Sequence, residues 1–155
     1  MKKLVIIPAF NESESIVQTV GNIRKCAPDY DLIVINDCSK DNTLQICREN
    51  EIPVLDLPIN LGIGGAVQTG YLYALKNHYD VAVQMDGDGQ HDALYLKDME
   101  ETLVRDNADM VIGSRFIEKK GFQSSGVRRV GIGIFKFLTG ALFGKAITDA
   151  TSGMR

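Results

Sequence analysis

The segment LVIIPAFNESESIV (residues 4–17) decides the fold class of this chain. Its first part, residues 4–7, is a run of apolar and β-branched side chains without polar alternation, which predicts a strand buried on both faces. Asn11 and Glu14 follow at the spacing of a helix-capping box. The next apolar residues recur at helical period: Ile16, Val17, Val20 and Ile23. The segment therefore predicts a buried strand, a polar loop and a helix in succession.

The same succession recurs along the chain. Further apolar runs predict strands at 32–35, 53–57, 81–85 and 110–113. Helical patterns lie between them at about 42–49, 65–77 and 94–105. Strands that alternate with helices in this way predict an α/β fold with a mainly parallel, doubly wound, Rossmann-like sheet covered on both faces. The 155 residues suit one such domain.

Composition and charge limit the range of possible functions. The chain is 45% hydrophobic and 24% charged, so it can bury a core, and its net charge of −3 argues against general nucleic-acid binding. Residues 115–147 depart from this balance, because they hold seven basic residues and one acid, Glu118. A local basic segment on an acidic protein indicates an anionic ligand or an anionic membrane surface.

Cellular location is predicted from features of the same kind. The three cysteines, Cys26, Cys38 and Cys47, have neither zinc-site spacing nor the even count of a disulfide framework. The N-terminus has too short an apolar core for a signal peptide, and Lys136 and Lys145 interrupt the apolar stretch 130–147. A reduced, cytoplasmic protein is the expectation.

Polar residues and glycines follow every predicted strand. The five loops contain PAFNE, NDCSKD, PINLGIGG, DGDGQ and GSRF. Open α/β sheets bind ligands in the crevice beyond the carboxyl ends of their strands. Ordinary turn chemistry explains one or two such loops, but all five together indicate a ligand site at this edge.

The motif DGDG (86–89) indicates a metal. Asp86 and Asp88 stand two residues apart, so their carboxylates point the same way if the strand persists, and a divalent cation relieves their repulsion. Oxygen ligands of this kind suit Mg²⁺ or Mn²⁺ together with a diphosphate. The motif fits a calcium-binding EF-hand less well, because Lys97 would stand at the twelfth position, where an EF-hand needs glutamate. No Walker motif is present.

The ordered motifs resemble one known family. PAFNE, NDCSKDNT, NLGIGGAVQTGYLYA, MDGDGQHD, GSRF, the arginine pair and TDATSGMR are similar in order and spacing to family 2 glycosyltransferases of the GT-A fold. The greatest similarity is to the dolichyl- or polyprenyl-phosphate sugar transferase branch, over residues 4–155. The resemblance implies an inverting, metal-dependent transferase that moves a sugar from a GDP-mannose or UDP-glucose type donor to a polyprenyl phosphate in cell-envelope glycan synthesis.

The resemblance also assigns site residues. It implies that the nucleotide contacts Pro8, Phe10, Glu12, Asp37, Asp86 and Gln90. Asp86 and Asp88 would hold the Mg²⁺ or Mn²⁺, with Asp88 as the principal ligand. Phosphates of donor or acceptor would face Arg115, Arg128 and Arg129. Asp149 stands at the position of the candidate catalytic aspartate; it would act as a base toward a hydroxyl acceptor, or as a positioning group toward a phosphate acceptor, whose second pKa is about 6.

Two departures from the family pattern are visible. Met154 replaces the phenylalanine usual in SGFR. From the resemblance we also expect residues 1–155 to be a single GT-A domain, and a fragment without the C-terminal part of family members. We expect the full-length protein to be peripheral to, or anchored at, the inner face of the plasma membrane, and a homo-oligomer remains open. Residues 127–147 fit either an amphipathic membrane-surface helix or a core helix.

Alternative functions remain at this stage. A non-catalytic nucleotide-sugar-binding domain and a glycosyltransferase acting on a saccharide hydroxyl both fit the motifs. A sugar-1-phosphate nucleotidyltransferase would need a glycine-rich, basic N-terminal loop in place of PAFNE. A receiver domain would need an aspartate after the third strand, where PINLG stands.

Overall fold

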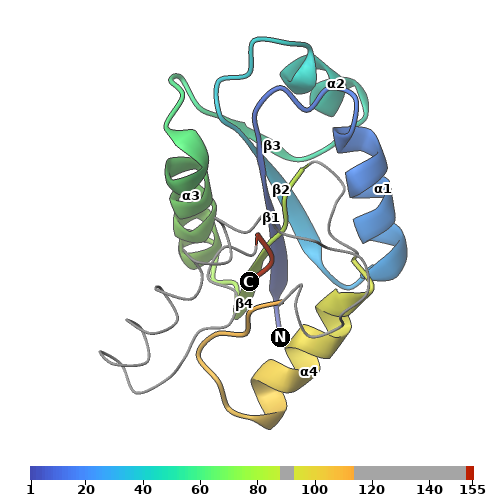
Figure 1. The fold of residues 1–155 in the computed structure, drawn as a ribbon, viewed down its shortest axis with the longest axis vertical. Helices are drawn as coiled ribbons and strands as arrows, with labels where there is room; N and C mark the ends of the chain where they lie inside the picture. The colour runs from blue at the N-terminus through green and yellow to red at the C-terminus, as the bar shows by residue number, and fades with distance from the viewer. Residues whose placement is uncertain (88–92, 114–152) are drawn as a thin grey trace, which may run out of the picture.

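The computed structural model describes residues 1–87, 93–113 and 153–155, and within them the predicted parallel sheet is confirmed (Figure 1). Four strands pair in the order β3-β2-β1-β4, and all three pairings are parallel. Their bounds are β1 Lys3–Ala9, β2 Asp31–Asn36, β3 Val54–Asp56 and β4 Val81–Gln84.

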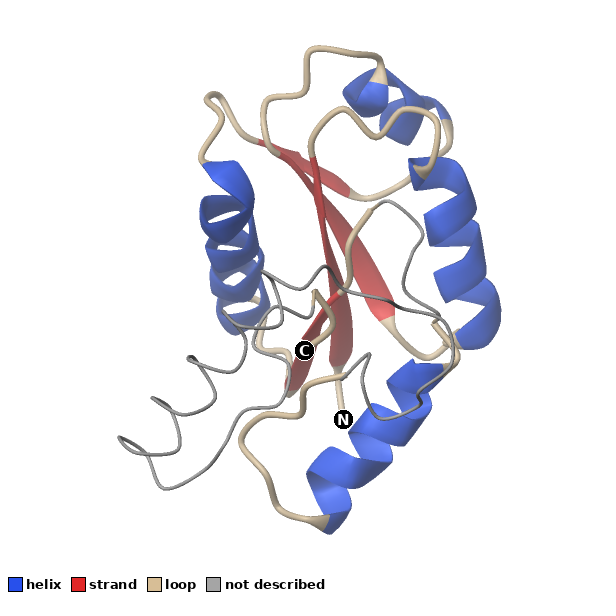
Figure 2. Cartoon of the chain, in the orientation of Figure 1, coloured by secondary structure: helices blue, strands red, loops and turns tan. Residues whose placement is uncertain are grey.

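Helices cover both faces of the sheet (Figure 2). Their bounds are α1 Ile16–Cys26, α2 Thr43–Glu49, α3 Gly62–Lys76 and α4 Tyr95–Arg105. One core joins the sheet to α1, α2 and α4, and a second core joins the opposite face to α3. Among the described helices, none is long and apolar enough to cross a membrane.

Strand β1 carries both cores at once. Val5 and Ile7 pack in the core that includes α1, whereas Leu4 and Ile6 pack in the core under α3. All four side chains are essentially unexposed. Because each face of β1 is covered, neither set of alternate positions can be polar, which explains the unbroken apolar run.

The strand order creates a topological switch point. The chain runs from β1 to β2 to β3 in one direction and then returns through α3 to β4 on the other side of β1. In such sheets the loops that follow the two strands flanking the reversal leave a crevice between them. The loops after β1 and β4 therefore frame the expected ligand site.

The amino end of β1 is fixed by a charged cluster. The Lys3 ammonium contacts the carboxylates of Asp29 and Glu100, and the Tyr30 hydroxyl donates to Glu100 at 2.9 Å. Hydrogen bonds to Asp29 and Glu100 raise the pKa of Lys3. This cluster ties α4 to β1 at the end of the sheet opposite the crevice.

The predicted capping box at Asn11 and Glu14 is wrong. Helix α1 begins at Ile16, with Ser15 at its N-cap position, and Asn11 has a positive φ of 59°. The side-chain oxygen of Asn11 accepts a hydrogen bond from the backbone N–H of Lys40 at 2.8 Å instead. Contact with a neighbouring loop therefore replaces the local capping interaction.

Two further boundaries differ from prediction. Helix α3 begins at Gly62 rather than Gly65, and residues 110–113 do not form a strand. At the observed start of α3, the Asp37 carboxylate accepts the backbone N–H of Leu61 at 2.7 Å, and the Asn60 side-chain oxygen accepts the N–H of Gly62 at 3.1 Å. Near 113, the Gly113 N–H donates to the Met154 carbonyl at 2.9 Å, and no continuous ladder accompanies this bond in the described part of the chain.

Gly70 is required where α3 crosses β1. A Cβ at Gly70 would overlap the Ile6 side chain, whereas a Cβ at Gly64 of the same helix would meet nothing within 4 Å. We expect Gly70→Ala to lower the free energy of unfolding by about 1–3 kcal/mol through overpacking. Gly64→Ala should raise it by up to about 1 kcal/mol through helix propensity. Urea denaturation of the two variants measures both effects, and equal losses would contradict the close approach of helix and strand.

Candidate functional site

Three loops meet at the carboxyl edge of the sheet. They follow β1 (residues 10–15), β2 (residues 37–42) and β4 (residues 85–87). The register of the ladder places Ala9 opposite Asn36 and Ile6 opposite Gln84, so the three loops start at neighbouring points of this edge. The main chain continues this pairing, since Met85 N–H donates to the Ile6 carbonyl at 2.9 Å.

The loops after β1 and β2 are joined by side chains. Three consecutive backbone N–H groups of the first loop donate to side-chain oxygens of the second loop and of the first residue of α2. Asn11 donates to Ser39 Oγ at 3.0 Å, Ser13 to Asp41 Oδ2 at 3.1 Å, and Glu12 to Thr43 Oγ1 at 2.9 Å. In the opposite direction, the Lys40 N–H of the second loop donates to the Asn11 side-chain oxygen. We call these interactions of residues 11–13 with residues 39–43 the inter-loop clamp.

Asp41 is the most highly coordinated residue of the clamp. Its Oδ1 accepts from both the backbone N–H and the hydroxyl of Thr43, while its Oδ2 accepts from Ser13. Burial acts to raise the pKa of this carboxyl, but the hydrogen bonds from Thr43 and Ser13 outweigh burial and hold the pKa at about 2. Asp41 is therefore an anion that three donors stabilise.

Asp37 links the second loop to α3. Its side chain is buried, its N–H donates to the Ala9 carbonyl at 2.9 Å, and its Oδ1 accepts from the Leu61 N–H at 2.7 Å. The Asn60 amide donates to the Asp37 carbonyl at 3.0 Å. Asp37 thus has a clear structural role at the start of α3, and its predicted contact with a nucleotide base stays a prediction.

Asp86 lies at the end of β4, half-buried, against a second segment. The Gln84 amide approaches Asp86 Oδ1 at 3.5 Å. A Cβ at Gly153 would overlap the Asp86 carboxylate, so only glycine fits there without displacing this group. Gln84 N–H also donates to the Arg155 carbonyl at 2.8 Å. The structure therefore places residues 153–155, the end of TSGMR, directly beside Asp86.

Gly87 brings the first and third loops together. A Cβ at Gly87 would lie 3.3 Å from the Pro8 carbonyl oxygen and 3.5 Å from Glu12 Cγ. Its own carbonyl accepts the Thr19 hydroxyl of α1 at 3.1 Å. Glu12 in turn accepts the Ser15 hydroxyl at 2.7 Å. Glu12 and Asp86, predicted separately from two motifs, consequently flank one backbone turn.

The predicted site residues divide into two groups. Pro8, Phe10, Glu12, Asp37 and Asp86 all lie at the carboxyl edge of the sheet, and Phe10 is 43% exposed there. The others lie outside the described residues: Asp88, Gln90, Arg115, Arg128, Arg129 and Asp149. No group of three His, Cys, Asp or Glu residues able to hold a metal occurs in residues 1–87, 93–113 and 153–155. The predicted pair of Asp86 and Asp88 remains untested, because Asp88 lies outside them.

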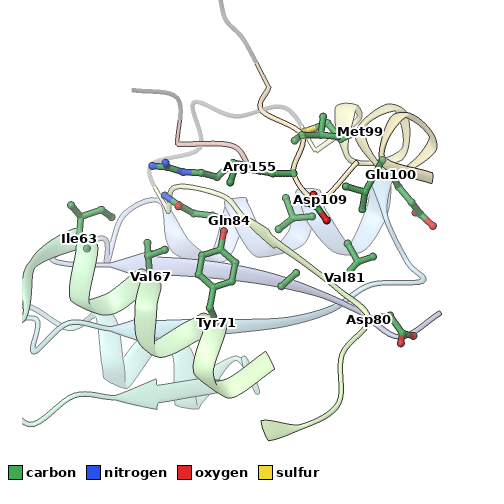
Figure 3. Close-up of a pocket in the computed structure, with 16 residues that line it drawn as sticks. Ile63, Val67, Tyr71, Asp80, Val81, Gln84, Met99, Glu100, Asp109 and Arg155 are labelled. Atoms are coloured by element: carbon green, nitrogen blue, oxygen red, sulfur yellow. The ribbon is translucent and has the colours of Figure 1, made fainter. Parts of the chain in front are cut away.

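A cavity of about 540 Å³ adjoins the site along β4. Figure 3 shows Tyr71, Gln84 and Arg155 close together, with apolar side chains of α3 on one side. On the other side lie both apolar and acidic side chains, including Glu100 and Asp109. Gln84 is buried, and its Oε1 has no hydrogen-bond partner among the residues that the structure describes. Burial raises the pKa of Tyr71 against the opposing charge of Arg155. Gln84 and Arg155 line the cavity next to the carboxyl edge of the sheet, and the Gln84 amide approaches Asp86.

Motif reasoning missed the residues that hold the loops together. Thr19, Asp41, Thr43 and Gly153 each contact a predicted site segment, yet none carries an obvious functional signal in isolation. The run SKDNT (39–43) offered the clearest indication, because it has more short oxygen-bearing side chains than a turn requires.

Comparison with known proteins identifies the family. The model of "Glycosyl transferase family 2" matches residues 4–155, and the chain belongs to this family. It is 39% identical over 120 residues to an undecaprenyl-phosphate mannosyltransferase of Micrococcus luteus, covering 74% of this chain and 49% of that protein. It is 32% identical over 170 residues to a UDP-N-acetylglucosamine–dolichyl-phosphate N-acetylglucosaminyltransferase of Methanococcus voltae, covering 97% and 67%.

A solved structure confirms the fold. Glucosyl-3-phosphoglycerate synthase of Mycobacterium tuberculosis, in complex with Mn²⁺, UDP-glucose and phosphoglyceric acid, superimposes with a TM-score of 0.70 at 20% identity over 99% of this chain and 55% of that one. The GT-A-like class and the resemblance to the dolichyl- and polyprenyl-phosphate branch are thereby confirmed. The chain spans about half to two thirds of the length of these curated relatives.

The low pKa of Asp41 predicts a specific acid sensitivity. A carboxyl whose folded-state pKa is about 2, below the usual value of about 3.9, contributes stability that is complete above about pH 4 and is lost as the pH falls through about 2. We expect the stability difference between the wild type and Asp41→Asn to narrow as the pH falls from 5 to 2. Urea unfolding across this range measures it, with Glu14→Gln as a control for net charge. A constant difference would show that Asp41 is not held as an anion.

Proposed function

We propose that the full-length protein transfers a hexose, with inversion, from a nucleoside-diphosphate sugar to a polyprenyl phosphate. The observation that carries this proposal is the position of Asp86. The first acid of the DGDG motif stands at the switch point of the sheet, with Glu12 beside the following glycine and residues 153–155 against its carboxylate. Family membership supports glycosyl transfer as the reaction class.

The residues at this edge fit a divalent cation. Asp86 supplies a hard carboxylate oxygen at the rim of the sheet, and Asp88 follows two residues later. When bound there by Asp86 and Asp88, Mg²⁺ or Mn²⁺ would neutralise the negative charge that develops on a nucleoside-diphosphate leaving group. The relative crystallised with Mn²⁺ and UDP-glucose supports this choice of ion.

The first two loops would hold the nucleotide. Phe10 offers an exposed aromatic surface, and Pro8, Glu12 and Asp37 surround the point where β1 and β2 end. Gln90 follows the metal-binding motif. We propose a donor of the GDP-mannose or UDP-glucose type, a class consistent with the mannosyl and N-acetylglucosaminyl transferases among the relatives.

A lipid phosphate is the proposed acceptor. The two relatives named above act, by their names, on undecaprenyl phosphate and dolichyl phosphate. Arg115, Arg128 and Arg129 supply planar cations suited to phosphate oxygens. A phosphate is already a nucleophile near neutral pH, so Asp149 would position it rather than take its proton. The reaction would take place on the cytoplasmic face of the membrane during cell-envelope glycan synthesis.

Metal-dependent ligand binding tests the donor half of this proposal. We expect UDP- or GDP-sugars to raise the melting temperature only in the presence of Mn²⁺ or Mg²⁺, by roughly 5–10 °C at a hundredfold excess over Kd. Asp88→Ala should abolish the metal dependence because it removes the principal ligand. Equal shifts with and without metal would contradict the mechanism.

Gly153 provides a matched structural variant for the same titration. Gly153→Ala should weaken the metal-dependent shift because its Cβ displaces the Asp86 carboxylate. Gly113→Ala is the control, since a Cβ there lies 3.4 Å from the Met154 side chain, which is ordinary van der Waals contact. A Gly153→Ala protein that keeps the full shift would show that Asp86 does not contribute to the metal site.

Sugar transfer tests the acceptor half. The full-length protein, supplied with radiolabelled donor, should label polyprenyl phosphate in a product that partitions into organic solvent. Replacement of Arg128 and Arg129 by alanine should reduce transfer at least tenfold while leaving the metal-dependent donor shift in place. Label found on a soluble saccharide would favour a hydroxyl acceptor instead, and metal-dependent donor binding without any transfer would indicate a non-catalytic domain.

A further inference from the structure

The inter-loop clamp goes beyond what α2 needs for its own start. The bond from the Thr43 N–H to Asp41 Oδ1 is a local turn of the kind that commonly precedes a helix. The other interactions of this pair cross to the first loop: Ser13 N–H donates to Asp41 Oδ2, and Glu12 N–H donates to Thr43 Oγ1. A residue that only began α2 would need neither of these.

The hydroxyl of Thr43 connects the two halves of the clamp. It donates its hydrogen to Asp41 Oδ1, which leaves its oxygen lone pairs directed at other donors, and it accepts the Glu12 N–H at 2.9 Å. Thr43 is fully buried, so water cannot replace either bond. Two successive hydrogen bonds, through the Thr43 hydroxyl, therefore connect the backbone of Glu12 to the Asp41 carboxylate.

Glu12 passes this constraint on to the β4 loop. Its Cγ lies against Gly87, at a distance of 3.5 Å from the position of a Cβ there, and Gly87 directly follows Asp86. Phe10 and Asp37 lie on the two clamped loops themselves. The pair of Asp41 and Thr43 is therefore hydrogen-bonded to the loop after β1. Through Glu12, it is also in contact with the segment that bears the metal motif.

We propose that Asp41 and Thr43 are positioning residues for the donor nucleotide, which hold the loops after β1 and β2 as one preformed surface. This assignment rests on the proposed function and extends it to residues that do not touch the ligand. When the surface is fixed before binding, the free energy of binding does not include the entropic cost of ordering two loops. Loss of the clamp should therefore weaken nucleotide binding in addition to lowering the stability of the fold.

Paired substitutions at Thr43 test the assignment. Thr43→Val keeps the shape of the buried side chain and removes the acceptor for Glu12, whereas Thr43→Ser keeps the hydroxyl. We expect Thr43→Val to raise the Kd for UDP or GDP, measured by calorimetry with Mn²⁺, by about tenfold, which corresponds to about 1.4 kcal/mol. Thr43→Ser should restore it to within about threefold of wild type.

Asp41→Asn gives a second, independent variant. The amide keeps an acceptor for Thr43 but presents N–H to the Ser13 N–H, so the cross-loop bond is lost. We expect a similar rise in Kd and faster hydrogen exchange at the amides of Glu12 and Ser13. All titrations are run at a temperature at which circular dichroism shows every variant to be folded.

Asp29→Asn is the matched control for stability. It makes the same chemical change at a carboxylate that contacts Lys3 at the opposite end of the sheet. It should lower the melting temperature and leave the nucleotide Kd within twofold of wild type.

Three results would overturn part of this account. An unchanged Kd in Thr43→Val and Asp41→Asn would overturn the positioning role alone. An equal rise in the nucleotide Kd of Asp29→Asn would also overturn the positioning role, because the loss of binding would then reflect lower stability in general. Failure of the wild type to bind either nucleotide would overturn the proposed function, and the assignment with it.

Discussion

The burial of β1 on both faces is the constraint on which the rest of this structure depends. Leu4, Val5, Ile6 and Ile7 are removed from water by helices on opposite sides. Strand β1 pairs with β2 along one side and with β4 along the other. Burial of such side chains contributes about 1.5–3 kcal/mol each. This interior can contain no functional polar group without large cost, so polar side chains are confined to the ends of the strands.

Charged side chains are stabilised differently at the two ends of β1. At the amino end, Lys3 is placed between Asp29 and Glu100 and above the Tyr30 ring, 4.7 Å from its centroid, so its charge is neutralised within the protein. At the carboxyl end, the acids are directed to backbone N–H groups and to a rim that includes Asp86.

Close approaches at glycine adapt this framework to the site. Gly70 allows α3 to lie directly on Ile6, and Gly153 allows the end of TSGMR to lie directly on Asp86. In both places a single methyl group would displace a group on a different element. The first approach sets the position of α3 against the sheet, and the second joins two motifs that are separated by more than sixty residues of sequence.

Sequence patterns determined the α/β class, the four strands near 4–7, 32–35, 53–57 and 81–85, and the family, because buried strands and turn motifs carry local signals that do not depend on their partners. The family resemblance singled out Pro8, Phe10, Glu12, Asp37 and Asp86, which all lie at the carboxyl edge of the sheet, and their contact with a ligand stays a prediction. Sequence patterns failed at Asn11 and at residues 110–113, where contacts with Lys40 and Met154 override local preference. Tertiary structure alone decided that Asp41 and Thr43 clamp the loop after β1, that the Asp37 carboxylate accepts the N–H of Leu61 just before α3, and that Gly153 meets Asp86. Each of these is a contact between elements far apart in the chain, and its energy depends on distances that no local spacing encodes.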